Sequence, residues 1–133
     1  MSKAAEKSLI AVLGAKLAAL GPFIARPMFG GYGLYIDGLI FGLMVGDQVF
    51  LKVDERNRGR FESAGSRPFR YETSRGETSI ASYWRCPDDV LADARKLRLW
   101  TNEALSASRQ ARQKKPARKK IVGRPSRQRN PFL

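Results

Sequence analysis

Apolar residues recur at intervals of three and four positions over residues 4–20. Side chains at this spacing share one face of an α-helix, and charged residues occupy much of the rest. The pattern therefore predicts an amphipathic helix that buries one side. Its apolar positions are Leu9, Ile10, Leu13, Leu17 and Leu20. Gly21 and Pro22 follow directly and end the predicted helix.

The pattern then changes to short runs rich in aromatic and branched residues. Three such runs occupy residues 28–36, 39–45 and 49–53. Asp37-Gly38 separates the first run from the second, and Gly46-Asp47 separates the second from the third. Two-residue separators of this composition are typical of β-hairpins. The segment therefore predicts a three-stranded antiparallel meander.

A second helix and a second hairpin are predicted after the meander. Asp54 is a candidate N-cap for a helix that ends at Ala64, with Gly65 as its C-terminal stop. Two further strands are predicted at residues 69–73 and 78–85, and a turn at Arg75-Gly76 joins them.

The last helical region of the folded part opens at Pro87 and Asp88. Acidic residues in a first turn interact favourably with the helix dipole. The predicted buried face consists of Val90, Leu91, Leu97, Trp100, Ala104 and Leu105. The order is thus helix, three-stranded meander, helix, two further antiparallel strands and one or more C-terminal helices. Strands grouped in hairpins between helices predict an α+β fold, with the helices packed on an antiparallel sheet.

Positive charge is concentrated at the C-terminal end of the chain. Residues 109–133 contain ten Lys and Arg and no acidic residue, whereas residues 1–108 contain 15 Lys and Arg against 12 Asp and Glu. The net charges are +10 and +3, so we expect a folded domain over residues 1–108 and a basic tail over residues 109–133. The tail is too poor in apolar residues to fold alone, which predicts disorder. The preceding helix is expected to continue for about a turn, before Pro116 stops it.

The composition excludes several classes of protein. The chain has no His, which removes Ser-His and Cys-His nucleophile pairs and histidine metal sites. Its one cysteine, Cys86, cannot form an internal disulfide. No apolar run is long enough to cross a membrane, and no secretory signal is visible. We therefore expect a cytoplasmic protein without catalytic residues, cofactor, metal or membrane partner.

Several motifs along the folded part carry a resemblance to a known family. Residues 26–35 read Arg-Pro-Met-Phe-Gly-Gly-Tyr-Gly-Leu-Tyr, which resembles the opening signature of the TfoX/Sxy N-terminal domain family of competence regulators. Further matching motifs are Phe41-Gly42-Leu43, Leu51-Lys52-Val53-Asp54, Pro68-Phe69-Arg70-Tyr71, Ser82-Tyr83-Trp84, Pro87-Asp88-Asp89-Val90 and the helix containing Leu97 and Trp100. The resemblance covers roughly residues 5–108.

The resemblance implies an α+β fold with a curved antiparallel sheet, similar to that of secretion chaperones. It also implies a link to transcription, because the full-length regulators promote competence genes together with a cyclic-AMP-dependent activator. Those regulators carry a second, helical domain where this chain has its basic tail. The chain is therefore expected to be a stand-alone member of the family.

Two conspicuous motifs of the folded part receive structural interpretations. Gly30, Gly31 and Gly33 do not form a dinucleotide fingerprint, because Ile36 stands where the last glycine is required. They are expected to permit a bulge or a close backbone approach within the sheet. Adjacent helical residues point about 100° apart, so Asp88-Asp89 is interpreted as a pair of dipole partners rather than a paired carboxylate site.

Cys86 and a group of arginines complete the candidates of the folded part. Cys86 is interpreted as a small buried residue at a strand end. The arginines are Arg56, Arg58, Arg60, Arg67, Arg70 and Arg75. They are expected to form a solvated face paired with Glu55, Glu62, Glu72 and Glu77. Alternatively, they contact phosphate or an acidic partner if they share a surface with Tyr71 or Tyr83.

The tail holds the candidate nucleic-acid site. Ten cations without an acidic residue bind phosphates through counterion release, whatever the base sequence. The expected phosphate contacts are Lys114, Lys115, Arg118, Lys119, Lys120, Arg124, Arg127 and Arg129. Residues 119–127 also resemble an AT-hook, which places an Arg-Gly-Arg-Pro core in an AT-rich minor groove. Gly123-Arg124-Pro125 is present, with Val122 where the motif has its first arginine. The alternative is a tail that only keeps the chain in solution, or one that binds acidic protein or membrane surfaces.

Three classes of function are considered. The first is a non-enzymatic, transcription-linked regulator or adaptor that associates with DNA through its tail and docks a protein partner through its folded part. The second is a protein–protein interaction module, either a homodimer or a partner-binding domain, with an incidental tail. The third is an enzyme built on Lys52, Tyr83 or Cys86 together with a carboxylate, which ranks last because no catalytic spacing is visible.

Overall fold

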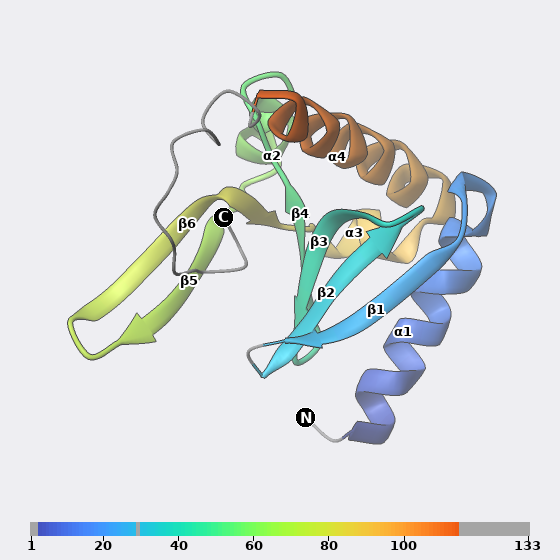
Figure 1. The fold of residues 1–133 in the computed structure, drawn as a ribbon, viewed down its shortest axis with the longest axis horizontal. Helices are drawn as coiled ribbons and strands as arrows, with labels where there is room; N and C mark the ends of the chain where they lie inside the picture. The colour runs from blue at the N-terminus through green and yellow to red at the C-terminus, as the bar shows by residue number, and fades with distance from the viewer. Residues whose placement is uncertain (1–2, 29, 115–133) are drawn as a thin grey trace.

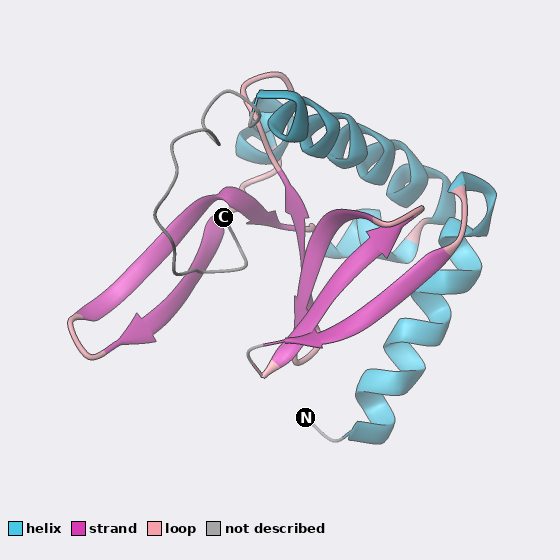
Figure 2. Cartoon of the chain, in the orientation of Figure 1, coloured by secondary structure: helices cyan, strands magenta, loops and turns pink. Residues whose placement is uncertain are grey.

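The chain folds into one six-stranded antiparallel sheet with helices on one face (Figure 2). The structure is a computed structural model, and it describes residues 3–28 and 30–114 (Figure 1). The helices are α1 (Lys3–Leu17), the 3-10 turn η1 (Ala18–Leu20), α2 (Arg58–Ser63), α3 (Asp88–Ala92) and α4 (Ala94–Lys114). The strands are β1 (Phe23–Met28), β2 (Gly31–Ile36), β3 (Leu39–Val45), β4 (Gln48–Lys52), β5 (Pro68–Thr73) and β6 (Gly76–Arg85). Their order in the sheet is β1-β2-β3-β4-β6-β5.

The predicted α+β architecture is confirmed, and the meander has one strand more than predicted. The run at residues 28–36 contains the end of β1 and all of β2, and the chain reverses between them. Gly30 has a φ of +78° at this reversal, and Met28 pairs with Gly31 across it. β1 was not predicted from the sequence because it contains Pro27. Proline is tolerated in a strand mainly at the edge of a sheet, and the sequence alone does not show which strand is at the edge. β1 is such an edge strand.

The turn between β2 and β3 has the backbone that its sequence predicts. Asp37 has a φ of +56° and Gly38 a φ of +77°. Two successive positive φ values are the signature of a type I′ hairpin turn, for which Asp-Gly is among the preferred sequences.

The helix predicted from Asp54 begins later, at Arg58. The Asp54 carboxylate accepts a hydrogen bond from the Arg56 backbone N–H at 2.9 Å, and the Asn57 side chain accepts one from the Asp54 N–H at 2.8 Å. These bonds hold residues 54–57 in a turn, so Asp54 does not act as the N-cap. Gly65 follows the helix with a φ of +75°, as its predicted role requires.

The C-terminal helical region is divided in two at Asp93. The Asp93 side chain accepts hydrogen bonds from the backbone N–H groups of Arg95 (2.9 Å) and Lys96 (3.1 Å). This is the geometry of an N-cap, so the aspartate ends α3 and starts α4. α4 runs to Lys114, which agrees with the expected continuation past Ser108.

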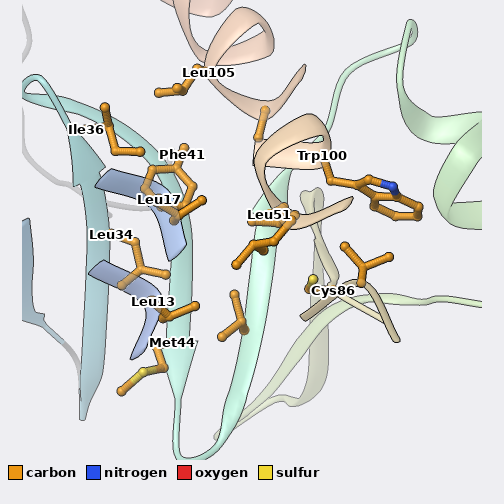
Figure 3. Close-up of a cluster of buried hydrophobic side chains, with 14 of the residues drawn as sticks. Leu13, Leu17, Leu34, Ile36, Phe41, Met44, Leu51, Cys86, Trp100 and Leu105 are labelled. Atoms are coloured by element: carbon orange, nitrogen blue, oxygen red, sulfur yellow. The ribbon is translucent and has the colours of Figure 1, made fainter. Parts of the chain in front are cut away.

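The main core lies between the sheet and the helices (Figure 3). Leu13 and Leu17 of α1 pack there with Leu34, Phe41 and Leu51 of the sheet. Five of the six apolar residues predicted to form the buried face of the last helical region are buried, and Leu91 is half-buried. Within the described residues, no helix is both long and apolar enough to cross a membrane.

A second, smaller cluster lies on the opposite side of the sheet. It joins Leu43 and Phe50 of the meander to Phe69, Ile80 and Tyr83 of the β5–β6 hairpin. The pairing jumps from Pro68–Trp84 to Phe69–Ile80, so residues 81–83 form an irregularity where β6 leaves the meander. The outer part of the hairpin therefore projects away from β1–β4, on the side remote from α1 (Figure 1).

Candidate partner and nucleic-acid interfaces

The side of the meander opposite the helices carries a group of apolar, aromatic and cationic residues. Phe23 and Ala25 of β1 pack against the main core, so the alternating residues Ile24 and Arg26 point to the other side. Cross-strand pairing extends this side over β2, β3 and β4. We call this surface the rear face and define it by Ile24, Arg26, Tyr35, Ile40, Val45 and Lys52.

Both cations of the rear face lie over tyrosine rings. The Arg26 guanidinium carbon is 5.3 Å from the centroid of the Tyr35 ring, and the Lys52 ammonium nitrogen is 5.0 Å from the centroid of the Tyr83 ring. Both distances are within the range of a cation–π interaction. Lys52 and Tyr83 are register partners, whereas Arg26 reaches Tyr35 diagonally.

Tyr83 serves as a buried aromatic support. Its side chain is buried, and this burial, with a smaller contribution from Tyr35, raises the pKa of the Tyr83 hydroxyl above its usual value. The phenol therefore stays neutral and presents a π-face to Lys52.

Gly31 and Gly33 allow the strands and side chains of the rear face to approach closely. A Cβ at Gly31 would collide with the carbonyl oxygen of Met44, and one at Gly33 would lie 2.8 Å from the Met28 methyl carbon. The same Cβ at Gly33 would be 3.1 Å from a carbon of the Tyr35 ring. The predicted close backbone approach is confirmed at Gly31, whereas the close neighbours of Gly33 are side chains and a Cβ at Gly30 would meet nothing within 4 Å.

Two large apolar side chains of the rear face are open to solvent. Ile24 is 47% exposed and Val45 is 39% exposed. The sequence interpretation missed this surface, because β1 was not assigned as a strand. The signal present in the sequence is the alternation of Phe23 and Ala25 with Ile24 and Arg26.

Cys86 is buried, as predicted, and its thiol is held in the protonated form. Burial raises the pKa of Cys86 to about 12, so little thiolate is present at neutral pH. Asp88 binds Arg85 at 3.0 Å and Asp89 binds Lys96 at 3.5 Å, so the two carboxylates contact different cations. Within residues 3–28 and 30–114, no three Cys, Asp or Glu side chains are grouped to hold a metal ion.

Four of the six arginines singled out in the sequence form ion pairs on the surface. Arg56 pairs with Asp54 at 2.8 Å, Arg58 with Glu62 at 3.8 Å, Arg60 with Glu103 at 2.7 Å, and Arg70 with Glu77 at 3.7 Å. The expectation of a paired, solvated face is confirmed for these four, although Asp54 and Glu103 are partners that the sequence did not suggest. Arg67 and Arg75 are exposed.

The structure places one of the eight residues expected to bind phosphate. Lys114 is the last residue of α4. The other seven, Lys115, Arg118, Lys119, Lys120, Arg124, Arg127 and Arg129, lie outside the described residues, as does the AT-hook-like segment. Arg109 and Arg112 precede them on α4, and both are exposed.

A single curved sheet, with helices on one side and a projecting hairpin on the other, defines an α+β domain that resembles neither a parallel nucleotide-binding fold nor a helical bundle. Residues 15–108 match the TfoX N-terminal domain, and the chain belongs to that family. A comparison with curated proteins gave no match.

Proposed function

We propose that this protein is a non-enzymatic regulator or adaptor linked to transcription, which associates with DNA through residues 109–133. Membership of the TfoX N-terminal domain family supports the link to transcription. The distribution of charge supports the association with DNA, because the chain contains no acidic residue after Glu103.

The observation that carries this proposal is the course of α4. The helix is continuous from Ala94 to Lys114, and it passes from the buried residues Ala107 and Ser108 to the exposed Arg109 and Arg112. The first cations of the basic segment are thus rigidly attached to the folded part. In this proposal the eight tail cations contact phosphates, and Arg124 enters the minor groove of AT-rich DNA.

Fluorescence anisotropy with short AT-rich and GC-rich duplexes over a range of salt concentrations tests the proposal. If all eight tail cations contact phosphates, the logarithm of affinity falls with the logarithm of salt concentration with a slope of about −7. Replacing those eight residues with Gln should abolish most of the affinity and flatten the slope. A control with Arg67→Gln and Arg75→Gln should bind as the parent does. Equal binding by the eight-residue variant would refute the proposal.

A second candidate function is a protein–protein interaction module, with a tail that only keeps the chain in solution. The exposed Ile24 and Val45 favour it, because exposed apolar groups rimmed by polar residues mark interaction sites. Light scattering over a range of concentrations distinguishes a homodimer from a monomer that needs another partner.

A further inference from the structure

Strand β1 forms an open edge of the sheet, because β2 is its one neighbour in the described sheet (Figure 1). The Asp37 backbone N–H donates a hydrogen bond to the Pro22 carbonyl oxygen at 3.0 Å, so these two residues are a hydrogen-bonded pair of the ladder. Such pairs alternate with non-hydrogen-bonded pairs along antiparallel strands. The backbone groups of Ile24 therefore face β2, whereas those of Phe23 and Ala25 face the open edge.

The open edge offers two N–H and two C=O groups. Within residues 3–28 and 30–114, no hydrogen bond joins those of Phe23 and Ala25 to another part of the chain. Further along the edge, Pro27 has no N–H, and the Gly21 N–H already donates to the Ala18 carbonyl oxygen at 3.3 Å. The unpaired donors are thus confined to the first half of β1. A row of unpaired backbone groups is a template for pairing with another strand.

The same half of β1 exposes a large apolar side chain. Ile24 is 47% exposed on the rear face. The three other exposed large apolar residues of the described part lie on helices or on the inner strand β3, so Ile24 is the one beside an open edge. The opposite edge strand, β5, carries Arg70 and Glu72, and charges of this kind protect an edge from pairing.

A second copy of β1 satisfies all four open groups in one antiparallel register. When Phe23 of each copy lies opposite Ala25 of the other, each residue both donates to its partner and accepts from it. In a register centred on Ala25, Phe23 would face Pro27 and its carbonyl would find no N–H. In a register centred on Phe23, Ala25 would face Gly21, whose N–H is bonded to Ala18.

The side chains also match in this register. Ile24 lies opposite Ile24 of the other copy in a non-hydrogen-bonded pair, the type in which side chains are closest. The exposed part of both isoleucines is then removed from water, and cross-strand apolar pairs stabilise a sheet. On the side of the helices, Phe23 lies beside the small side chain of Ala25.

The charges around the open edge do not oppose this pairing. Arg26 lies opposite Pro22 of the other copy, and Pro22 is bonded to Asp37, so a residue of opposite sign stands at that end. Helix α1 approaches β1 at Gly14, where an added Cβ would lie 3.3 Å from the ring of Phe23. Lys7, on the same side of α1, is exposed and lies about two turns further along the helix.

We propose that the protein forms a two-fold symmetric dimer in which the β1 strands of two copies pair antiparallel, with Phe23 opposite Ala25 and Ile24 opposite Ile24. The two six-stranded sheets then form one continuous sheet. This inference goes beyond the proposed function and does not require DNA binding, and it identifies the surface of the homodimer named there as a second candidate. A dimer carries two basic segments, which raise the affinity for DNA if both engage one duplex.

Disulfide formation between copies tests the register. Cα atoms of a non-hydrogen-bonded pair lie about 4.5 Å apart, within the reach of a disulfide. Ile24→Cys should therefore give a covalent dimer under mild oxidation, seen by non-reducing electrophoresis. The matched control is Arg26→Cys, on the same side of the same strand, because its two copies would be separated by about 13 Å along the strands and should stay unlinked. Cys86 is buried and does not take part.

Light scattering measures the assembly without a covalent link. Both experiments use the full chain with the eight tail cations replaced by Gln, because nucleic acid bound to native tails would also bring copies together. We expect a mass of about twice 14.9 kDa that falls towards that of the monomer on dilution. Ile24→Lys places like charges opposite each other and should give a monomer at every concentration. Val45→Lys, the same change on an inner strand, should remain dimeric.

Several outcomes would overturn the proposal. They are a parent chain that is monomeric at all concentrations, equal linking of Ile24→Cys and Arg26→Cys, and equal dimerisation of Ile24→Lys and Val45→Lys. Linking of Arg26→Cys alone would place the pairing in another register and would also overturn it. If circular dichroism shows that Ile24→Lys is unfolded, the comparison of the two cysteine variants decides.

The dimer and the DNA association fail separately. A tail-substituted chain that still forms the linked dimer, with a parent whose duplex affinity does not depend on the tail, keeps this inference and removes the DNA proposal. A monomer whose duplex affinity depends on the tail has the opposite meaning.

Discussion

Lys52 and Tyr83 face each other across β4 and β6, and the ammonium nitrogen lies 5.0 Å from the centre of the phenol ring. The pair lies where the meander meets the β5–β6 hairpin, beside the smaller hydrophobic cluster that joins them. A cationic residue thus covers the buried ring at the junction of the two parts of the sheet.

Replacing Lys52 with Met should destabilise the fold by about 0.5–2 kcal/mol, since it removes the cation–π interaction and keeps the apolar stem. Lys52→Arg should retain most of the stability. Urea denaturation monitored by circular dichroism measures both variants. A Met variant as stable as the parent would show that the charge over Tyr83 contributes nothing.

Gly31→Ala should be more destabilising than Gly33→Ala. At Gly31 the added methyl group meets the backbone carbonyl of Met44, which cannot move without disturbing the ladder. At Gly33 it meets the flexible end of Met28, which can change rotamer. We expect a loss of about 1–3 kcal/mol or more at Gly31 and a smaller one at Gly33. Denaturant midpoints of the two variants give the comparison, and equal losses would contradict it.

Asp93 should make stability depend on pH in the acidic range. Hydrogen bonds from the backbone N–H of Lys96 and of Arg95 lower the pKa of Asp93 below that of an ordinary aspartate. A lowered pKa in the folded state means that the stabilisation is complete above the unfolded value and is lost as pH falls through the folded value. Asp93→Asn keeps a capping oxygen and should remove this part of the pH dependence. Thermal unfolding between pH 2 and pH 7 tests it, and parallel curves for parent and variant would argue against it.

Cys86 should resist alkylation in the native protein. Its thiol is buried and has a pKa of about 12, so iodoacetamide at pH 8 should react only when the chain unfolds. Labelling should become rapid in urea above the unfolding transition. Fast labelling without denaturant would mean that the strand end around Cys86 opens locally.

Thr101→Val should leave the stability of the protein unchanged or raise it by up to about 1 kcal/mol. Among the described residues, the Thr101 hydroxyl is a buried side-chain oxygen without a hydrogen-bond partner, on the side of α4 that faces the core. Valine has nearly the same shape and removes the buried polar group. Thr101→Ser, which keeps the hydroxyl and loses a methyl group, is the control and should be less stable than the parent.

Local patterns in the sequence were sufficient to predict most of the helices and strands. The three- and four-residue spacing of leucines identified α1, and Asp37-Gly38 identified the hairpin between β2 and β3, because both depend on residues close together in the chain. β1 was not predicted because Pro22 precedes it and Pro27 lies within it, and the cost of a proline depends on whether a strand lies at the edge of its sheet. The sequence also did not predict that Asp93 caps α4, because the spacing of apolar residues is helical on both sides of it.

The sequence by itself determined α1, the hairpins β2–β3, β3–β4 and β5–β6, the α+β class and the concentration of cations after residue 108, since these follow from short-range spacing and from charge. Only the tertiary structure decided which residues share a surface. Arg60 meets Glu103 across 43 positions of the chain, and Lys52 meets Tyr83 because β4 pairs with β6 rather than with β5. Such contacts depend on how the strands are ordered and how the sheet bends, and those are set by the packing of the whole core rather than by any local segment.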